Sequence, residues 1–101
     1  MAKTALTRDE ALLQLRKHKP ELVEKFGLSS LALFGAVVRD EAEEDSSIDI
    51  LVGFEGEVDW KRYFGVQFYI EDMMGHQVVL VTEQALRKEL RPYIDAESVY
   101  V

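Results

Sequence analysis

The predicted order of helices and strands indicates a small α/β domain, in which helices pack against a sheet of three or four strands. Short apolar runs bounded by glycine or polar residues predict buried strands over 31–34, 48–54 and 77–81. Segments with helical spacing of apolar residues lie before, between and after these strands. The 101 residues, 48% of them hydrophobic, suffice for one packed core, so we expect a single domain, 1–101.

Two short helices are predicted before the first strand. Thr7 with Glu10 three residues later matches a capping box at the start of the first helix. Proline is favoured in the first turn of a helix, and glycine is favoured just after its end. Pro20 and Gly27 therefore bracket a second helix over 21–26.

A long helix and a final shorter helix are predicted on either side of the third strand. Asp59 can cap a helix over 60–74, since a side-chain oxygen there accepts from a free N–H group. Thr82 can cap a last helix that runs to Leu90. Pro92 should stop that helix, because the residue before a proline disfavours helical geometry.

Aromatic residues dominate the predicted long helix. Trp60, Phe64 and Phe68 recur every four residues, which predicts one apolar face packed on the sheet. Tyr63 and Tyr69 lie beside this series and combine an apolar ring with a polar tip, a composition enriched in protein interfaces. They are our candidates for partner contacts.

Composition and charge exclude several classes of protein. The chain has no cysteine, which excludes disulfides and thiolate metal sites, and a net charge of -7, which argues against binding to DNA or RNA. No apolar run approaches the roughly 20 residues that span a bilayer, so we expect no membrane association. The N-terminus lacks the apolar core of a secretion signal, and we expect a cytoplasmic protein. The segment 40–46 is too acidic to pack and should be a loop.

The first motif is Gly35-Ala36, directly after the apolar run 31–34. A glycine at the end of a strand lets the backbone approach a ligand closely, and free N–H groups beyond it can hold a phosphate. A tight turn with no ligand would carry the same two residues. This motif alone therefore leaves both interpretations open.

The second motif is Ser47-Ile48-Asp49 at the start of the next strand. Side chains two residues apart leave the same face of a strand, so Ser47 and Asp49 share a face. Asp49 interrupts an apolar run, where a buried carboxylate is costly unless it meets a partner. Three explanations stay open: a bound divalent cation, a face open to solvent, or an ion pair with Arg39.

Taken together, the two motifs resemble those of the minimal nucleotidyltransferases (MNT) of the polymerase-β-like superfamily. That family carries Gly-Ser, ten residues, Asp-x-Asp, and a third Asp in a Val-Asp-Leu-Val-Thr context. Here Phe34-Gly35-Ala36 is followed by ten residues, Ser47-x-Asp49 and a later Val81-Thr82, and 86–94 is similar to the family's closing segment. The resemblance implies a mixed sheet and a partnership with HEPN-domain proteins in toxin–antitoxin modules.

The chain departs from the family pattern at the positions that carry its chemistry. Asp49 and Arg39 match retained family residues. Four other positions are substituted: Ala36 for Ser, Asp40 for Gly, and Ser47 and Val79 for Asp. In the family, three carboxylates bind magnesium, which bridges the nucleotide phosphates. A lone Asp49 cannot fix the octahedral oxygen cage that magnesium requires, so we expect nucleotidyl transfer to be absent or very weak.

Other residues near the motif offer only a weak substitute for the lost ligands. Asp45 could swing in from the loop, Glu43 and Glu44 lie further away, and His76 precedes the third strand. Each is better explained as a solvated side chain. We therefore expect no cofactor, and a metal, if any, on Asp49.

Three functions remain in competition at this point. The preferred hypothesis is a catalytically degenerate antitoxin subunit that binds a HEPN-domain partner. The alternative is an active enzyme that uses Mg-ATP to transfer AMP to a partner side chain through Asp49. A nucleotide sensor, with Gly35, Ala36 and Arg39 as weak phosphate ligands, ranks last, since nearby carboxylates oppose a polyanion.

The end of the chain is the other candidate contact surface. Val99, Tyr100 and Val101 form an apolar finish to a polar segment, and we predict that their removal weakens partner binding. Homo-oligomer formation is left open by the sequence.

Overall fold

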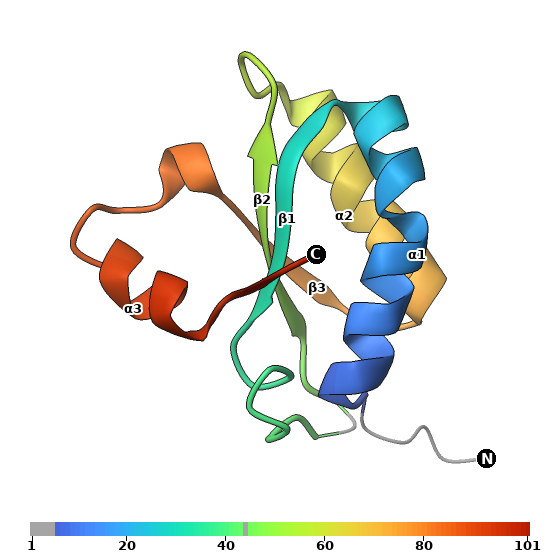
Figure 1. Ribbon diagram of the computed structural model, residues 1–101. Coiled ribbons are helices and arrows are strands. Elements are labelled where there is room, and N and C mark those ends of the chain that lie inside the picture. The colour runs from blue at the N-terminus through green and yellow to red at the C-terminus, as the bar shows by residue number, and fades with distance from the viewer. Residues whose placement is uncertain (1–5, 44) are drawn as a thin grey trace.

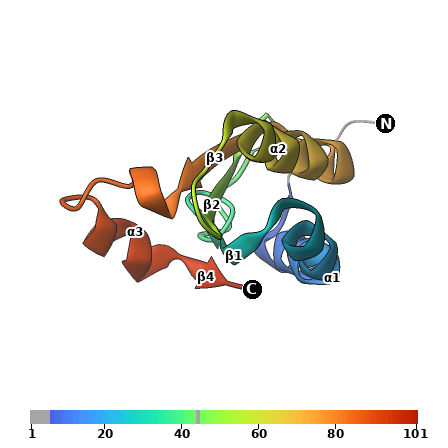
Figure 2. The same ribbon diagram turned by 90° about the horizontal axis from the view of Figure 1, so that it is seen from above.

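A mixed four-stranded sheet forms the centre of the computed structural model, which describes residues 6–43 and 45–101. Along the chain the elements are α1 (Arg8–Phe26), β1 (Leu28–Phe34), β2 (Ile48–Phe54), α2 (Trp60–Met74), β3 (Val78–Thr82), η1 (Glu83–Ala85), α3 (Arg91–Glu97) and β4 (Val99–Tyr100). Helices α1 and α2 cover one face, and α3 lies on the other side of the sheet (Figure 1, Figure 2). The predicted fold class is confirmed. None of the helices in the described part of the chain is long and apolar enough to cross a membrane.

The strand order is β3-β2-β1-β4, so β2 lies between β3 and β1. Strand β1 runs antiparallel to β2 and β4, whereas β2 and β3 are parallel. Parallel neighbours need a crossover connection, and α2 supplies it. The register places Phe34 opposite Asp49 on one side and Val79 opposite Asp49 on the other.

The two faces of the sheet bury different amounts of apolar surface. The face under α1 and α2 carries the main core, which includes Leu15, Leu22, Leu31, Ile48, Ile50, Val52, Val66 and Ile70. The opposite face carries a smaller cluster of Ala32, Phe34 and Leu51, against which Val81, Leu86 and Ile94 pack. The predicted alternation of β2, with Asp49 and Leu51 on the second face, agrees with these clusters.

The N-terminal segment is one continuous helix, so the predicted break at Pro20 was wrong. Thr7 caps the helix by accepting from the Glu10 N–H at 3.2 Å, as predicted, and Gly27 ends it in the left-handed conformation. Pro20 removes one internal hydrogen bond, but it lies on the exposed side, where water can reach the free carbonyl. Burial of Leu15 and Leu22 on either side holds the helix together through the proline.

The aromatic face predicted for α2 was also wrong. Trp60, Phe64 and Phe68 are 68%, 43% and 62% exposed, whereas Val66 and Ile70 are fully buried. The helix is capped by Asp59 as predicted, but it is rotated so that its shorter aliphatic residues meet the sheet. Stacking of Phe64 on Phe68, with ring centroids 6.1 Å apart, leaves an aromatic stripe on the outer surface.

This rotation is explained by the edge of the sheet beside α2. The Tyr63 hydroxyl donates to the Leu80 carbonyl at 2.7 Å, and the Gln67 amide donates to the Val78 carbonyl at 3.3 Å. The Glu71 carboxylate accepts from the Val78 N–H at 3.0 Å. Side chains of α2 therefore form hydrogen bonds with backbone groups on the outer edge of β3. These hydrogen bonds protect that edge from pairing with another strand.

The C-terminal quarter differs most from the prediction. Thr82 does cap a helical turn, but that turn is only η1, and the predicted helix to Leu90 is replaced by turns. Pro92 lies at the start of α3 instead of ending a helix, since a proline in the first turn loses no internal hydrogen bond. Beyond α3, the expected tail forms β4, in which Val99 pairs with Leu33.

Glu83 ties this C-terminal segment to the sheet. Its carboxylate accepts from the Ser30 hydroxyl at 2.6 Å, from the Arg91 guanidinium at 3.0 Å and from the Tyr100 hydroxyl at 3.1 Å. The Ser30 hydrogen bond, together with those of Tyr100 and Arg91, lowers the pKa of Glu83 despite partial burial. One carboxylate thus joins β1, α3 and β4.

We predict that Glu83→Gln lowers the free energy of unfolding by about 1–2 kcal/mol at neutral pH, because the three hydrogen bonds to this carboxylate lose its negative charge. Because its pKa is lowered in the folded state, Glu83 stabilises the fold fully only above the ordinary Glu pKa of about 4.3. This stabilisation is lost as the pH falls through the lowered pKa. Urea unfolding of wild type and variant should therefore converge at acid pH. Glu89→Gln, at an exposed position, is the control, and equal losses in both variants would contradict the role of Glu83.

Candidate functional site

The candidate site lies where β1 ends and β2 begins, on the face opposite α1 and α2. Gly35 follows the last residue of β1 and has a φ of 79°, a left-handed conformation that favours glycine. A Cβ atom at Gly35 would overlap the carboxylate of Asp49. As expected, another group lies close against the Gly35 backbone, but this group is the Asp49 side chain of the same protein and not a ligand.

The loop after Gly35 curls back toward the sheet. The Arg39 N–H donates to the Gly35 carbonyl at 3.3 Å, and the Glu41 N–H donates to the Ala36 carbonyl at 2.9 Å. Val37 is 1% exposed and anchors this turn in the core. The fold of the loop therefore brings the Arg39 side chain back to the end of β1.

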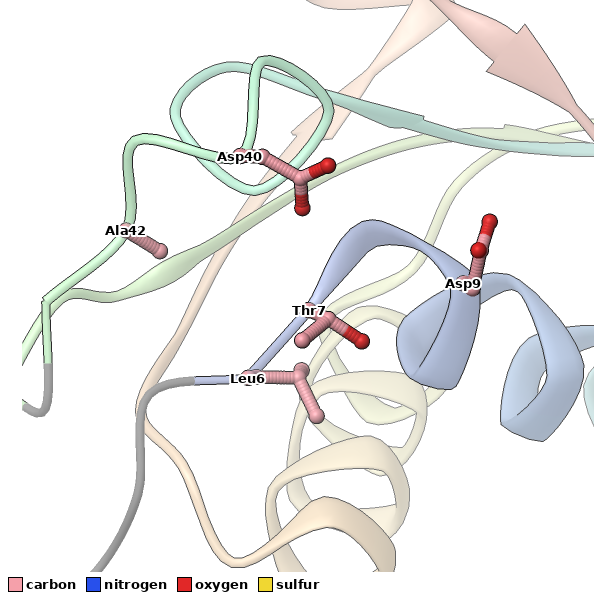
Figure 3. Close-up of a pocket in the computed structure, with 5 residues that line it drawn as sticks. All are labelled: Leu6, Thr7, Asp9, Asp40 and Ala42. Atoms are coloured by element: carbon pink, nitrogen blue, oxygen red, sulfur yellow. The ribbon is translucent and has the colours of Figure 1, made fainter.

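Asp40 explains how the loop tolerates the loss of the family glycine. Its φ of 55° is left-handed, and aspartate is one of the few residues other than glycine that adopts this conformation readily. The Asp40 carboxylate also accepts from the Arg8 N–H at 2.9 Å and so ties the loop to the start of α1. A hollow of about 420 Å³ lies between these segments, lined by Leu6, Thr7, Asp9, Asp40 and Ala42 (Figure 3). Asp49 does not line it.

Asp49 is the half-buried carboxylate of the site. Burial raises its pKa, and the negative charge of Glu97 raises it further, whereas the Arg39 charge and a hydrogen bond from the Ala36 backbone act in the opposite direction. Asp49 does not form the direct ion pair with Arg39 that was one of the three explanations for its position. Arg39 forms its ion pairs with Glu41 at 3.0 Å and Glu97 at 2.6 Å.

Glu97, the last residue of α3, completes the site and was missed by sequence reasoning. One carboxylate oxygen accepts from the Gly35 N–H at 3.0 Å, and the other accepts from Arg39 Nη1 at 2.6 Å. Glu97 lies 62 residues from Gly35 and belongs to no motif, so nothing in the sequence signals this contact. Only the pairing of β4 with β1 brings the end of α3 to this place.

The positions of the family's metal ligands lie together, but their donor atoms do not fit magnesium. Asp49 and Val79 are neighbours in the register of β2 and β3, and Ser47 is the half-buried residue before β2. Val79 offers no donor atom, and both oxygens of Glu97 are already engaged by nitrogen donors. Magnesium usually needs carboxylates together with substrate phosphates in octahedral geometry, which one aspartate does not provide.

The residues that the sequence offered as weak substitutes for the metal ligands do not assemble into a site. Asp45 and Glu43 are exposed loop residues, and His76 lies half-buried in the turn between α2 and β3. Glu44 lies outside the described residues. Across residues 6–43 and 45–101, no group of three or more His, Asp or Glu side chains is placed to hold a metal ion.

The candidate partner residues are engaged within the fold to different degrees. The Tyr63 hydroxyl contacts β3, and the Tyr69 hydroxyl donates to Glu21 at 2.6 Å, which raises the pKa of Tyr69 to about 12. Val99 and Val101 are half-buried beside β1, while Tyr100 is 46% exposed. On α2, Trp60, Phe64 and Phe68 are therefore the exposed aromatic residues, whereas Tyr63 and Tyr69 form hydrogen bonds within the fold.

Comparison with known proteins identifies similar sequences over nearly the full length. The family described as "Nucleotidyltransferase domain" matches residues 15–100. A protein of Thermococcus cleftensis named protein adenylyltransferase MntA is 38% identical over 96 residues, which cover 95% of this chain and 97% of that relative.

Solved structures of minimal nucleotidyltransferases have the same fold as this chain. A structure provisionally named a minimal nucleotidyltransferase shares 29% identity with a TM-score of 0.79, covering 93% of this chain and 95% of that one. A chain from the complex of a tri-AMPylated Shewanella oneidensis HEPN toxin with its MNT antitoxin has a TM-score of 0.64 at 17% identity, covering 89% of this chain and 70% of that chain. At that identity the likeness concerns the fold alone.

We predict that Gly35→Ala destabilises the protein by about 2–4 kcal/mol, since it adds left-handed strain and a clash with Asp49. Gly56→Ala is a matched control, because Gly56 has a φ of 71° and no atom within 4 Å of an added Cβ. Chemical unfolding of both variants separates the two effects. Equal losses would mean that the approach of Asp49 to Gly35 costs nothing.

We predict that Asp49→Asn raises the free energy of unfolding at neutral pH by at most about 1 kcal/mol, because a half-buried charge beside Glu97 is removed. The raised pKa of Asp49 means that its stabilising contribution is present below about 4 and is lost as the pH rises through the raised value. In urea unfolding the stability advantage of the variant should therefore grow as the pH rises above about 4. Asp45→Asn, in the exposed loop, is the control for removing one negative charge. A difference between Asp49→Asn and wild type that does not change with pH would contradict the effect of burial on Asp49.

Proposed function

This chain belongs to the nucleotidyltransferase domain family, among its minimal members, and from that premise we propose that it is the antitoxin subunit of a pair with a HEPN-domain toxin. In this proposal the chain acts by binding its partner and does not transfer a nucleotidyl group. The retained fold provides the surface that binds the partner, and without the family's carboxylates the chain does not hold the metal ions that nucleotidyl transfer requires.

One observation carries the catalytic half of this proposal. Where β2 and β3 would bring family carboxylates together, they bring Asp49 and Val79. Phosphoryl transfer through metal ions depends on cations held in fixed positions by several oxygen ligands. A single aspartate, whose pKa is raised by burial, supports weak cation binding at best.

The binding half is supported by relatives and by the surface. The T. cleftensis relative carries the name MntA, and the S. oneidensis structure is a complex between an MNT antitoxin and a HEPN toxin. The exposed aromatic stripe of Trp60, Phe64 and Phe68 offers the rigid apolar contacts that stable interfaces favour. Tyr100, next to the half-buried Val99 and Val101, is a second candidate contact.

A second candidate function is protein adenylyl transfer with Mg-ATP, and the name of the T. cleftensis relative favours it. In that case Asp49 would hold the metal, and Arg39 with the Gly35 backbone would hold the phosphates. Those two phosphate ligands are present in the structure, although both are bound to Glu97.

The two functions are separated by one experiment on a purified complex. The chain is co-expressed with a candidate HEPN-domain partner, and the purified complex is then incubated with labelled ATP and magnesium. We predict a stable complex, no label on the partner, and unchanged partner affinity in Asp49→Ala, because that residue does not form the binding surface. Label transfer that disappears in Asp49→Ala would establish the enzyme instead, and failure of the two proteins to associate would remove the HEPN partner.

A further inference from the structure

The contacts of Glu97 have the form of a bound anion. A backbone N–H group from Gly35 and a guanidinium N–H group from Arg39 converge on its two oxygens at 3.0 and 2.6 Å. Converging backbone and arginine donors are the groups that proteins use to hold phosphate and carboxylate ligands. Glu97 therefore fills a small anion site with a side chain of the same molecule.

The backbone that presents Glu97 is fixed on both sides. At the end of α3, the next residue, Ser98, donates its N–H and its hydroxyl to the Ile94 carbonyl, at 2.9 and 2.6 Å. After it, Val99 pairs with Leu33 in the sheet. The Glu97 side chain is itself 29% exposed, so its carboxylate can leave the site by rotation while α3 and β4 stay in place.

We propose that Glu97 is an intramolecular ligand that occupies the anion site between the Gly35 N–H and Arg39, so that a polyphosphate binds there only when this carboxylate leaves. The carboxylate and a phosphate group need the same two donors, and their binding is mutually exclusive. A tethered competitor is always present at high effective concentration, which lowers the apparent affinity for a free anion.

A second consequence is electrostatic. With Glu97 in place, Asp49 lies beside another negative charge, which contributes to its raised pKa. A polyphosphate that displaced Glu97 would still meet Asp49 and the remaining Glu97 charge nearby, and both oppose it. Neutralising Glu97 removes the competitor and one of these charges together.

A purely structural ion pair would behave differently from an internal competitor. If Glu97 served only to hold α3 against the loop, Glu97→Gln would reduce stability and leave anion affinity unchanged or lower. If Glu97 is a competitor, the same variant binds anions more tightly. Anion affinity therefore separates the two roles, and it is measured on the isolated chain, so the outcome does not depend on the HEPN partner or on nucleotidyl transfer.

The experiment is calorimetric titration of the purified chain with inorganic tripolyphosphate and, separately, with ATP, both without added metal. We expect Glu97→Gln to bind each at least about 10-fold more tightly than wild type, since a charge-assisted pair of hydrogen bonds no longer competes. Arg39→Gln combined with Glu97→Gln should lose this gain. Equal gains for the two ligands would assign the site to phosphate alone, and a larger gain for ATP would add a contact to the nucleoside.

Glu24→Gln is the matched control, because Glu24 is exposed on α1 and carries the same charge. An equal gain in this control would reduce the effect to net charge and overturn the proposal, as would unchanged affinity in Glu97→Gln. Amide NMR of the wild-type chain gives an independent test that needs no variant. Tripolyphosphate at saturating concentration should shift the Gly35 amide resonance, and a Gly35 amide that does not move would overturn the proposal.

Discussion

The pairing of β2 with both of its neighbours is the constraint on which the site depends. Antiparallel pairing with β1 sets Phe34 opposite Asp49, so the Gly35 backbone turns directly over that carboxylate. Parallel pairing with β3 sets Val79 on the other side of Asp49. A shift of either strand by one residue would move these side chains to the opposite face of the sheet, where the main core is packed.

Within this frame, the substitutions form a consistent electrostatic pattern. Carboxylates that converge on a metal repel one another when the metal is absent, so under the proposed function uncharged residues at two of the family's carboxylate positions avoid this repulsion. Val79 and Ser47 bring no charge, and the pKa of the remaining Asp49 is raised because burial and the Glu97 charge outweigh the Arg39 charge and the Ala36 hydrogen bond. The Gly35 N–H and Arg39, the proposed phosphate donors, both donate hydrogen bonds to the Glu97 carboxylate.

The C-terminal segment belongs to the site as well as to the fold. Glu83 holds α3 and β4 through Arg91 and Tyr100, and Lys19 of α1 donates to the Val101 carbonyl at 2.6 Å. These contacts fix the short segment that ends α3 and therefore fix Glu97. Any partner or ligand that displaced this segment would expose the Gly35 N–H and the Arg39 side chain together. Stability of the C-terminus and access to the anion site are thus coupled by the same few residues.

Local sequence determined the elements whose signals lie within a few residues. The caps at Thr7, Asp59 and Thr82 and the glycine end of α1 follow from hydrogen bonds between near neighbours, and the alternation of β2 follows from strand geometry. The two motifs and the family resemblance also pointed to Gly35, Arg39 and Asp49 as parts of one candidate site. Tertiary structure decided the rest: the continuity of α1 through Pro20, the outward aromatic stripe of α2, and the arrival of Glu97 at Gly35. Each of these depends on packing or pairing between residues far apart in the chain, which outweighs local preference and leaves no local pattern to read.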